Sequence, residues 1–107
     1  MIRRRRVVLD LEAIEDLRQI GRWVSERAGA TVARRYLARI RAFCQGLDVV
    51  SERGARRDDL RPGLRIVAFE RRVTVAFAVM EDRVVVLRIF YGGRDIDSIL
   101  GAVAEDE

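Results

Sequence analysis

The first part of the chain shows an apolar pattern that predicts one strand followed by one helix. Arg5 to Leu9 ends in three consecutive apolar residues, which favours a short strand. Asp10 follows at once and is a good N-cap residue, and the apolar side chains after it recur every three or four positions. We therefore predict a helix over about residues 10–28 that ends at Gly29, with an apolar stripe of Ala13, Ile14, Leu17, Ile20, Val24 and Ala28.

A second helix is predicted directly after the first. Thr31 is a suitable N-cap, and the apolar residues that follow trace one continuous stripe at helical spacing. The link between the two helices is so short that they form a hairpin, which can bury both stripes only against each other and a common sheet. We therefore expect Tyr36, Phe43 and Cys44 to be core residues. The full stripe consists of Ala33, Tyr36, Leu37, Ile40, Phe43, Cys44 and Leu47.

The second part of the chain predicts a surface connection and then three strands. Residues 51–63 break the periodicity with Gly54, a cluster of charges and a Pro62-Gly63 pair. The strands are predicted at 64–69, 73–80 and 83–91, separated by charged hairpin turns. Both alternating sets of the middle strand are mostly apolar, so this strand belongs in the centre of the sheet. Arg88 interrupts the apolar alternation of the last strand, and it either snorkels to the edge of the core or pairs with a carboxylate such as Glu70.

These elements predict an α+β fold in which one antiparallel sheet packs against a helical hairpin. The expected order is β-α-α-β-β-β, with a further short helix after Asp95 formed by Ile96, Ile99, Leu100 and Val103. The length of 107 residues suits one domain that spans residues 1–107.

Composition restricts the chemistry that this domain can perform. All 21 basic residues are arginine, there is no histidine, and Cys44 is the sole cysteine. Side chains that titrate near neutral pH are therefore almost absent, and arginine binds phosphate or carboxylate but does not accept a proton. We expect no catalytic residue, no metal site and no cofactor.

Charge and hydropathy point to a cytoplasmic protein with an acidic partner. Residues 1–50 carry 11 arginines and 6 acids, whereas residues 51–107 carry 10 arginines and 11 acids. The positive field of the first half attracts nucleic acid or an acidic protein, and it does not choose between them. The basic start is followed by only three apolar residues, too few for a signal peptide or a membrane span.

Three segments in this order closely resemble the ParE toxins of the RelE/ParE superfamily. They are Leu60-Arg61-Pro62-Gly63-Leu64-Arg65, the hydrophobic hairpin, and Phe90-Tyr91-Gly92-Gly93-Arg94-Asp95, and the first helix with Trp23 and Val24 also matches. The resemblance covers nearly the whole chain. It implies the toxin of a type II toxin–antitoxin pair that inhibits DNA gyrase by binding. It also implies a small antitoxin with a ribbon-helix-helix start and an acidic C-terminal segment. The toxin would contact operator DNA only indirectly, through this antitoxin.

The same superfamily implies an alternative function, a RelE-like ribonuclease that cuts messenger RNA on the ribosome. Such nucleases use basic residues on the sheet and a tyrosine about six positions beyond the final arginine. That position is Leu100 here, and Thr74 stands where the nuclease has another arginine. Tyr91 is the candidate that would restore the nuclease function, by stacking on a base. A third alternative is a protein of this fold that has lost toxicity and acts only as an antitoxin partner or corepressor.

The resemblance also suggests which residues carry binding. For the target we expect contacts from Arg65, Arg94, Tyr91 and Asp95, with Gly92 and Gly93 forming the turn that presents them. For the antitoxin, whose carboxylates would meet the arginines, we expect contacts from Trp23, Arg34, Arg35 and Arg88.

Overall fold

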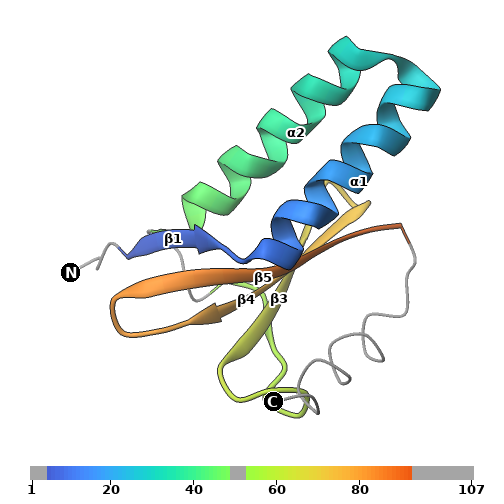
Figure 1. Cartoon of the computed structure of the whole chain (residues 1–107). Coiled ribbons are helices and arrows are strands. Elements are labelled where there is room, and N and C mark those ends of the chain that lie inside the picture. The colour runs from blue at the N-terminus through green and yellow to red at the C-terminus, as the bar shows by residue number, and fades with distance from the viewer. Residues whose placement is uncertain (1–4, 49–52, 93–107) are drawn as a thin grey trace.

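The computed structural model describes residues 5–48 and 53–92, and within these it confirms the predicted α+β fold (Figure 1). Two helices form an antiparallel hairpin that extends from one side of a single sheet. The predicted helix after Asp95 lies outside the described residues. In chain order the elements are β1 (Arg6–Leu9), α1 (Leu11–Ala28), α2 (Ala30–Gln45), a 3-10 turn (Gly46–Asp48), β2 (Ala55–Arg56), β3 (Leu64–Phe69), β4 (Val73–Val79) and β5 (Arg83–Tyr91).

The ends of the helices follow the predicted capping chemistry with one correction. The Asp10 side chain accepts a hydrogen bond from the Leu11 backbone N–H at 2.8 Å, which caps α1. Gly29 ends α1 and has a φ of 95°, a conformation that residues with a Cβ rarely adopt. The prediction that Thr31 caps α2 is wrong. Gly29 is the N-cap of α2 as well, because its carbonyl oxygen already accepts from the Ala33 N–H at 3.1 Å.

The five-stranded sheet has the order β1-β5-β4-β3-β2, which places β4 in the centre as predicted. All neighbouring pairs are antiparallel except β1 and β5, which run parallel. The parallel pair follows from the chain path. The helices α1 and α2 separate β1 from the other strands and bring the chain to the opposite edge of the sheet, where β2 lies. The partner of β1 is β5, with Val7 beside Val84 and Leu9 beside Val86.

Sequence patterns did not predict β2, which lies within the segment expected to be only a surface connection. Its two residues pair with β3, Ala55 with Ile66 and Arg56 with Arg65. The preceding Gly54 has a φ of 78°, and a Cβ at this position would lie 2.1 Å from the Ile66 carbonyl oxygen. A strand of two exposed residues has no alternation of apolar and polar positions, and therefore gives no signal in the sequence.

A bulge in β5 decides which side chains near its end face the helices. Ala76 of β4 lies opposite Arg88, whereas the next residue, Phe77, lies opposite Val86, so Leu87 is an extra residue on β5. The bulge shifts the alternation by one position. Val86 and Ile89 both face the helices as a result, and so does Tyr91 at the end of the strand. This shift explains why Arg88 interrupts the alternation in the sequence.

The main core lies between the helical hairpin and one face of the sheet. Cys44 is fully buried as predicted, and Tyr36 and Phe43 are half-buried and pack against the core. Burial raises the pKa of the Cys44 thiol to about 11. Ile14 and Ala28, expected in the stripe of the first helix, are exposed. The fully buried side chains of this core include Leu17, Ile40, Cys44, Leu47, Val75, Phe77, Val84 and Val86.

A second, smaller apolar cluster lies on the opposite face of the sheet. Leu64, Ala76 and Phe90 are its buried members, and Leu60, Ile66 and Leu87 pack around them. Neither α1 nor α2 covers this face. Among the described residues, the sheet therefore has apolar side chains on both faces, although both α-helices pack on one of them.

Candidate partner-binding groove

Three aromatic side chains from three different elements meet where β5 ends. Trp23 of α1 lies 4.8 Å from Tyr91 between ring centroids, and Tyr36 of α2 lies 6.2 Å from Tyr91 in an edge-to-face arrangement. Such contacts hold the rings in fixed orientations and add to the stability from their burial. The Trp23 side chain nevertheless remains 38% exposed, which is a large fraction for an aromatic ring that packs against another ring.

Two hollows of about 580 and 390 Å³ adjoin at these rings. Trp23, Tyr91 and Arg72 line both of them, so we treat the two as one surface and call it the aromatic groove. Its floor is apolar and its rim carries guanidinium groups. The rim arginines are Arg27, Arg39 and Arg72.

The rim arginines are arranged over the rings. The Arg27 guanidinium lies 4.0 Å from the centroid of the Trp23 ring, a distance typical of a cation–π contact. Arg39 lies 5.1 Å from the Tyr36 ring centroid and donates two hydrogen bonds to Glu70, at 2.9 and 3.2 Å. These hydrogen bonds lower the pKa of the Glu70 carboxyl, which is therefore a carboxylate near neutral pH. The rim thus holds fixed positive charge beside apolar rings.

The hydroxyl of Tyr36 stays protonated in this setting. Burial is the main cause that raises the pKa of Tyr36, and the neighbouring Tyr91 and Glu70 raise this pKa further. A protonated phenol donates a hydrogen bond but does not act as a base. The groove therefore offers apolar contact, cations and the phenol groups of Tyr36 and Tyr91, which is the chemistry of recognition.

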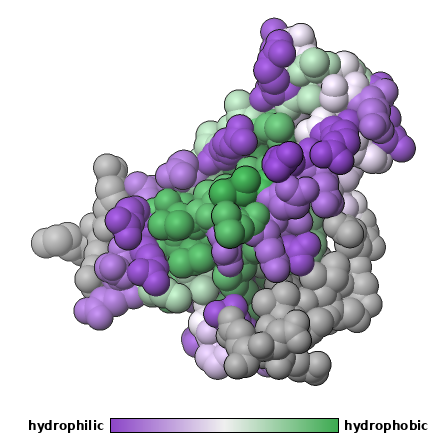
Figure 2. All heavy atoms as spheres, in the orientation of Figure 1, coloured by the Kyte–Doolittle hydropathy of each residue, from purple (hydrophilic) through white to green (hydrophobic). Residues whose placement is uncertain are grey.

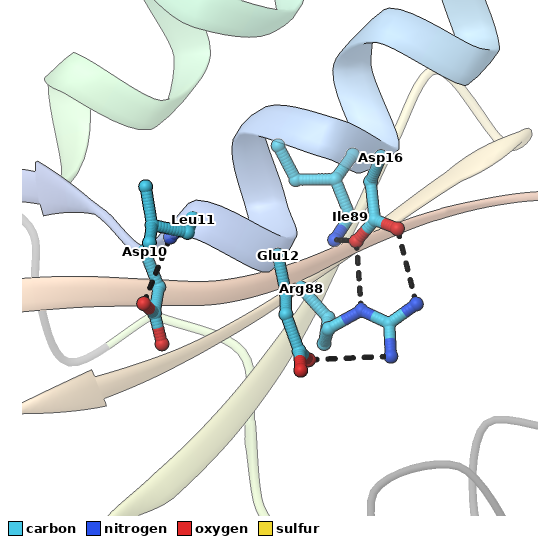
Figure 3. Close-up of polar contacts among 6 residues, drawn as sticks. All are labelled: Asp10, Leu11, Glu12, Asp16, Arg88 and Ile89. Carbon is cyan, nitrogen blue, oxygen red and sulfur yellow. Dashed lines mark hydrogen bonds and ion pairs between the residues drawn. The ribbon is translucent and has the colours of Figure 1, made fainter.

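A buried ion pair fixes the part of β5 that forms one wall of the groove (Figure 3). Arg88 donates two hydrogen bonds to the Asp16 carboxylate, at 2.8 and 3.0 Å, and the same carboxylate accepts from the Ile89 N–H at 2.8 Å. The side chains of Asp16 and Arg88 are only 6% and 17% exposed. The bidentate contact raises the pKa of Arg88, so the guanidinium keeps its charge.

Asp16 takes the place of a neighbouring strand at this edge of the sheet. The last residue of β1, Leu9, lies opposite Val86, and beyond that point no strand of residues 5–48 and 53–92 pairs with the outer edge of β5. The outward N–H of Ile89 is bonded by the α1 side chain instead. Because both the strand edge and its arginine are held by one carboxylate, the end of β5 has a fixed position relative to α1.

The structure does not bring the predicted target-binding residues Arg65 and Tyr91 together. Arg65 pairs with Phe77 of β4, whereas Tyr91 pairs with Val73 of the same strand. The two levels are four residues apart, about 13 Å at the usual rise of a strand. Arg65 donates long hydrogen bonds of 3.5 Å to the carbonyl oxygens of Arg53 and Gly54, near the opposite end of the sheet.

Part of the predicted target site lies beyond the described residues. Gly92 ends the description, with a φ of 79° and an N–H that donates to the Arg72 carbonyl oxygen at 2.8 Å. This geometry agrees with the turn predicted there. Gly93, Arg94 and Asp95 lie outside the described residues.

The four predicted antitoxin contacts occupy three different settings. Trp23 lies in the aromatic groove, and Arg34 and Arg35 are exposed on α2. Arg88 is held by Asp16 and has a second, longer contact with Glu12 at 3.7 Å. Of the alternatives left open for Arg88, pairing with a carboxylate is the one observed, but the partner is Asp16 and not the suggested Glu70, which pairs with Arg39.

Two residues of the site were missed by the sequence analysis. Asp16 falls inside the apolar stripe of α1, and an acid at a buried helix position requires a cation or several donors, so its position was a usable signal. Arg72 was interpreted only as a turn residue. Nothing in a short charged turn reveals that one of its arginines borders a groove, because that depends on the hairpin's position in the sheet.

The described residues contain no cluster of three or more acidic, cysteine or histidine side chains suited to a metal ion. Among the same residues, no helix has the length and apolar character needed to cross a membrane.

Comparison with known proteins identifies the family. The model of the "ParE toxin of type II toxin-antitoxin system, parDE" matches residues 7–96, which is most of the chain. The chain belongs to the ParE toxin family. A solved structure described as "Chromosomal ParDE TA system from P. aeruginosa" has the same fold, with a TM-score of 0.73 and 24% sequence identity. The alignment covers 83% of this ParE-family chain and 97% of that one. No curated protein matches the sequence.

Proposed function

We propose that this chain inhibits DNA gyrase by binding it, and that a cognate antitoxin neutralises it by occupying the aromatic groove. Membership of the ParE family makes it a toxin of a type II toxin–antitoxin system. The observation that carries the proposal is the groove itself, where the exposed Trp23 ring, the half-buried Tyr36 and Tyr91 rings and an apolar floor meet a rim of arginines. Enzyme-like chemistry is not required, because inhibition and neutralisation are both binding events.

The groove has the properties of a protein-binding hot spot. Tryptophan, tyrosine and arginine dominate binding energy at protein interfaces, and all three line this surface. An acidic antitoxin segment would place apolar side chains against Trp23 and Tyr91 and direct its carboxylates towards Arg27 and Arg72. Arg34 and Arg35, exposed on α2, would extend the positive surface that the segment meets.

The position of the groove suggests how binding of the antitoxin would relieve inhibition. The groove is bordered by Tyr91 and Gly92, and Arg94 follows two residues later in the sequence. We place the gyrase contact at Arg94 and Asp95, with Arg65 as a more distant contribution. An antitoxin seated on Tyr91 would bind within three residues of Arg94 along the chain, and would therefore compete with gyrase for this part of the toxin. Gyrase acts in the cytoplasm, and that is where we place this toxin.

Gyrase supercoiling assays with the purified toxin and its antitoxin test this proposal. The toxin should inhibit supercoiling, and added antitoxin should restore it. Trp23→Ala should still inhibit but should require at least about 30-fold more antitoxin for relief, the effect of losing about 2 kcal/mol at a hot spot. Arg94→Ala should lose inhibition while it still binds the antitoxin. Ile14→Ala is the matched control, because Ile14 is 41% exposed on the same helix and lines neither hollow.

Two results would contradict the proposal. Full inhibition by a folded, antitoxin-binding Arg94→Ala variant would remove the assigned target contact. Cutting of messenger RNA on translating ribosomes, without any effect on gyrase, would replace gyrase inhibition by the ribonuclease function.

A further inference from the structure

Three of the exposed large apolar side chains among the described residues gather on the sheet face that the helices leave uncovered. Val8 is 38% exposed, Leu11 is 80% exposed and Met80 is 39% exposed. They line one hollow of about 450 Å³ at the corner formed by β1, β5 and the β4–β5 hairpin. Figure 2 shows this apolar area over β1, β5 and the start of α1, bordered by hydrophilic residues. We call it the far-face patch, and it consists of Val8, Leu11, Ala78, Met80, Val85 and Leu87.

The patch follows directly from strand register. Val8 lies beside Val85 in the parallel pair, and Val85 lies opposite Ala78 in the antiparallel pair. These three side chains therefore point to one face, while their neighbours Val7 and Val84 point into the main core. A solvated sheet face normally carries polar side chains at such positions. Here it carries aliphatic ones, which is typical of a surface that another protein covers.

Two arginines at the rim of the patch lie side by side. Arg6 and Arg83 are neighbours in the β1–β5 register, on the same face as Val8 and Val85. Like charges at adjacent positions of paired strands repel each other. Among the described residues, Arg61 and Asp10 also line the hollow, and the Asp10 carboxylate caps α1. The adjacent Arg6 and Arg83 therefore concentrate positive charge at this part of the rim, where a partner's carboxylates would reduce the repulsion.

We propose that the far-face patch is a second docking site for the antitoxin, occupied by an acidic amphipathic segment that is distinct from the segment in the aromatic groove. This inference rests on the proposed function, because it takes the antitoxin as the occupant. The excess of arginine argues against a second copy of this chain, which would bring one arginine rim against another. A segment with aliphatic side chains flanked by carboxylates satisfies both the apolar floor and the charged rim.

The two docking sites are far enough apart to be separable. Leu11 is the first residue of α1 and Trp23 lies 12 positions later, a distance of about 18 Å along the helix axis. Between them, the Asp16–Arg88 pair closes the outer edge of β5. A partner that reaches both sites therefore crosses this ion pair and gains affinity from two anchors joined by a short linker.

Titration calorimetry of the full toxin with its full antitoxin tests the inference. The double variant Leu11→Glu, Met80→Glu places two carboxylates on the patch and should weaken binding at least 10-fold. Ala30→Glu is the matched control, because Ala30 is the exposed first residue of α2 as Leu11 is of α1, and it should bind within twofold of wild type. Trp23→Ala combined with the double variant should multiply the two losses, because the sites share no contacts.

The outcomes separate this inference from the proposed function. If Trp23→Ala weakens binding and the patch variant binds like wild type, the second site is wrong and the groove stands. If neither variant changes the affinity, both assignments fail. If the toxin alone is a dimer in sedimentation equilibrium and the patch variant is a monomer, the patch joins two copies and the inference is overturned. Thermal melting should show that each variant is folded at the temperature of the titration, and Trp23→Ala, which loses its ring contact with Tyr91, should melt earlier than the others.

Discussion

The helix-covered face of the sheet and the far-face patch carry similar side chains but have very different surroundings. On the helix-covered face, Val84 and Phe77 are fully buried beneath α1 and α2. In the far-face patch, Val8 and Met80 keep more than a third of their surface exposed, although Val8 lies beside Val85 of β5 and Met80 directly follows β4. The covered face stabilises the fold by burial that is already complete. The far-face patch retains apolar surface that can still be buried, and this makes it available for binding.

The comparison shows why hydrophobicity alone does not separate core from interface. Val7 and Val8 are identical residues in one short strand, and the position of the helical hairpin decides that Val7 packs against the main core whereas Val8 stays exposed. A sequence pattern that is apolar on both faces indicates a strand with two covered faces. The pattern does not tell whether the segment that covers the second face belongs to the same chain or to a partner protein.

Truncations on the two faces should give the largest contrast in stability. Phe77→Ala should lower the free energy of unfolding by about 3–5 kcal/mol, because it opens a cavity in a fully buried core. Met80→Ala should cost less than about 1 kcal/mol, because the side chain is 39% exposed. Urea unfolding followed by circular dichroism measures both.

A variant that does not fold would leave the first half of this contrast unmeasured, so a milder change accompanies it. Phe77→Leu keeps much of the side-chain volume and should cost about 1–2 kcal/mol, still more than Met80→Ala. Equal losses at Phe77 and Met80 would show that the far-face patch is packed as tightly as the covered face, and would contradict the distinction between them.

The Asp16–Arg88 pair, which joins the covered face to the edge of β5, should give the next largest effect. Asp16→Ala removes the partner of Arg88 and of the Ile89 N–H together, and should lower the free energy of unfolding by about 3 kcal/mol. Urea unfolding at neutral pH measures the loss. Hydrogen exchange should become faster at the Ile89 amide in particular, since its acceptor has gone.

A double variant distinguishes a specific loss from general damage to the core. Asp16→Leu combined with Arg88→Met replaces the ion pair by apolar groups of similar size, and should be more stable than Asp16→Ala. This comparison separates the cost of an unpaired buried charge from the contribution of the pair. If the double variant is as unstable as the single one, the main contribution of Asp16 is its bond to the Ile89 N–H.

The sequence predicted most of the fold because its helices and long strands have clear periodicity. The stripe of α1, the cap at Asp10, the stop at Gly29 and the central position of β4 all depend on local patterns. Two features depend on contacts between distant segments and could not be predicted this way. These are the pairing of β2 with β3 and the bulge at Leu87, which turns Tyr91 towards the helices.

The candidate site was only partly predictable for the same reason. Trp23 was selected from the chain and lies in the groove, but its neighbours Tyr36 and Tyr91 meet it only after the hairpin packs on β5. Arg65 and Tyr91 were grouped because the family resemblance joined them, whereas the sheet separates them along β4. Residues that approach from different elements leave no mark of that proximity in a single sequence.

The smallest effect near neutral pH concerns Cys44, which tests how completely the helices cover their face. Burial raises the pKa of this thiol from 9.0 to about 11 in the folded chain. The unfolded chain therefore loses the thiol proton first as the pH rises, so the contribution of the neutral thiol to stability is complete below about pH 9 and falls between pH 9 and 11. Urea midpoints at pH 8, 9 and 10 should fall more steeply for wild type than for Cys44→Ala, which lacks the thiol but keeps both tyrosines.

Alkylation of Cys44 by iodoacetamide at pH 8 should likewise be slow in the folded state and fast in urea, because only the thiolate attacks. Parallel pH dependence of the two proteins, together with rapid alkylation of the folded chain, would mean that water reaches the covered face and that the two faces differ less than their exposures indicate.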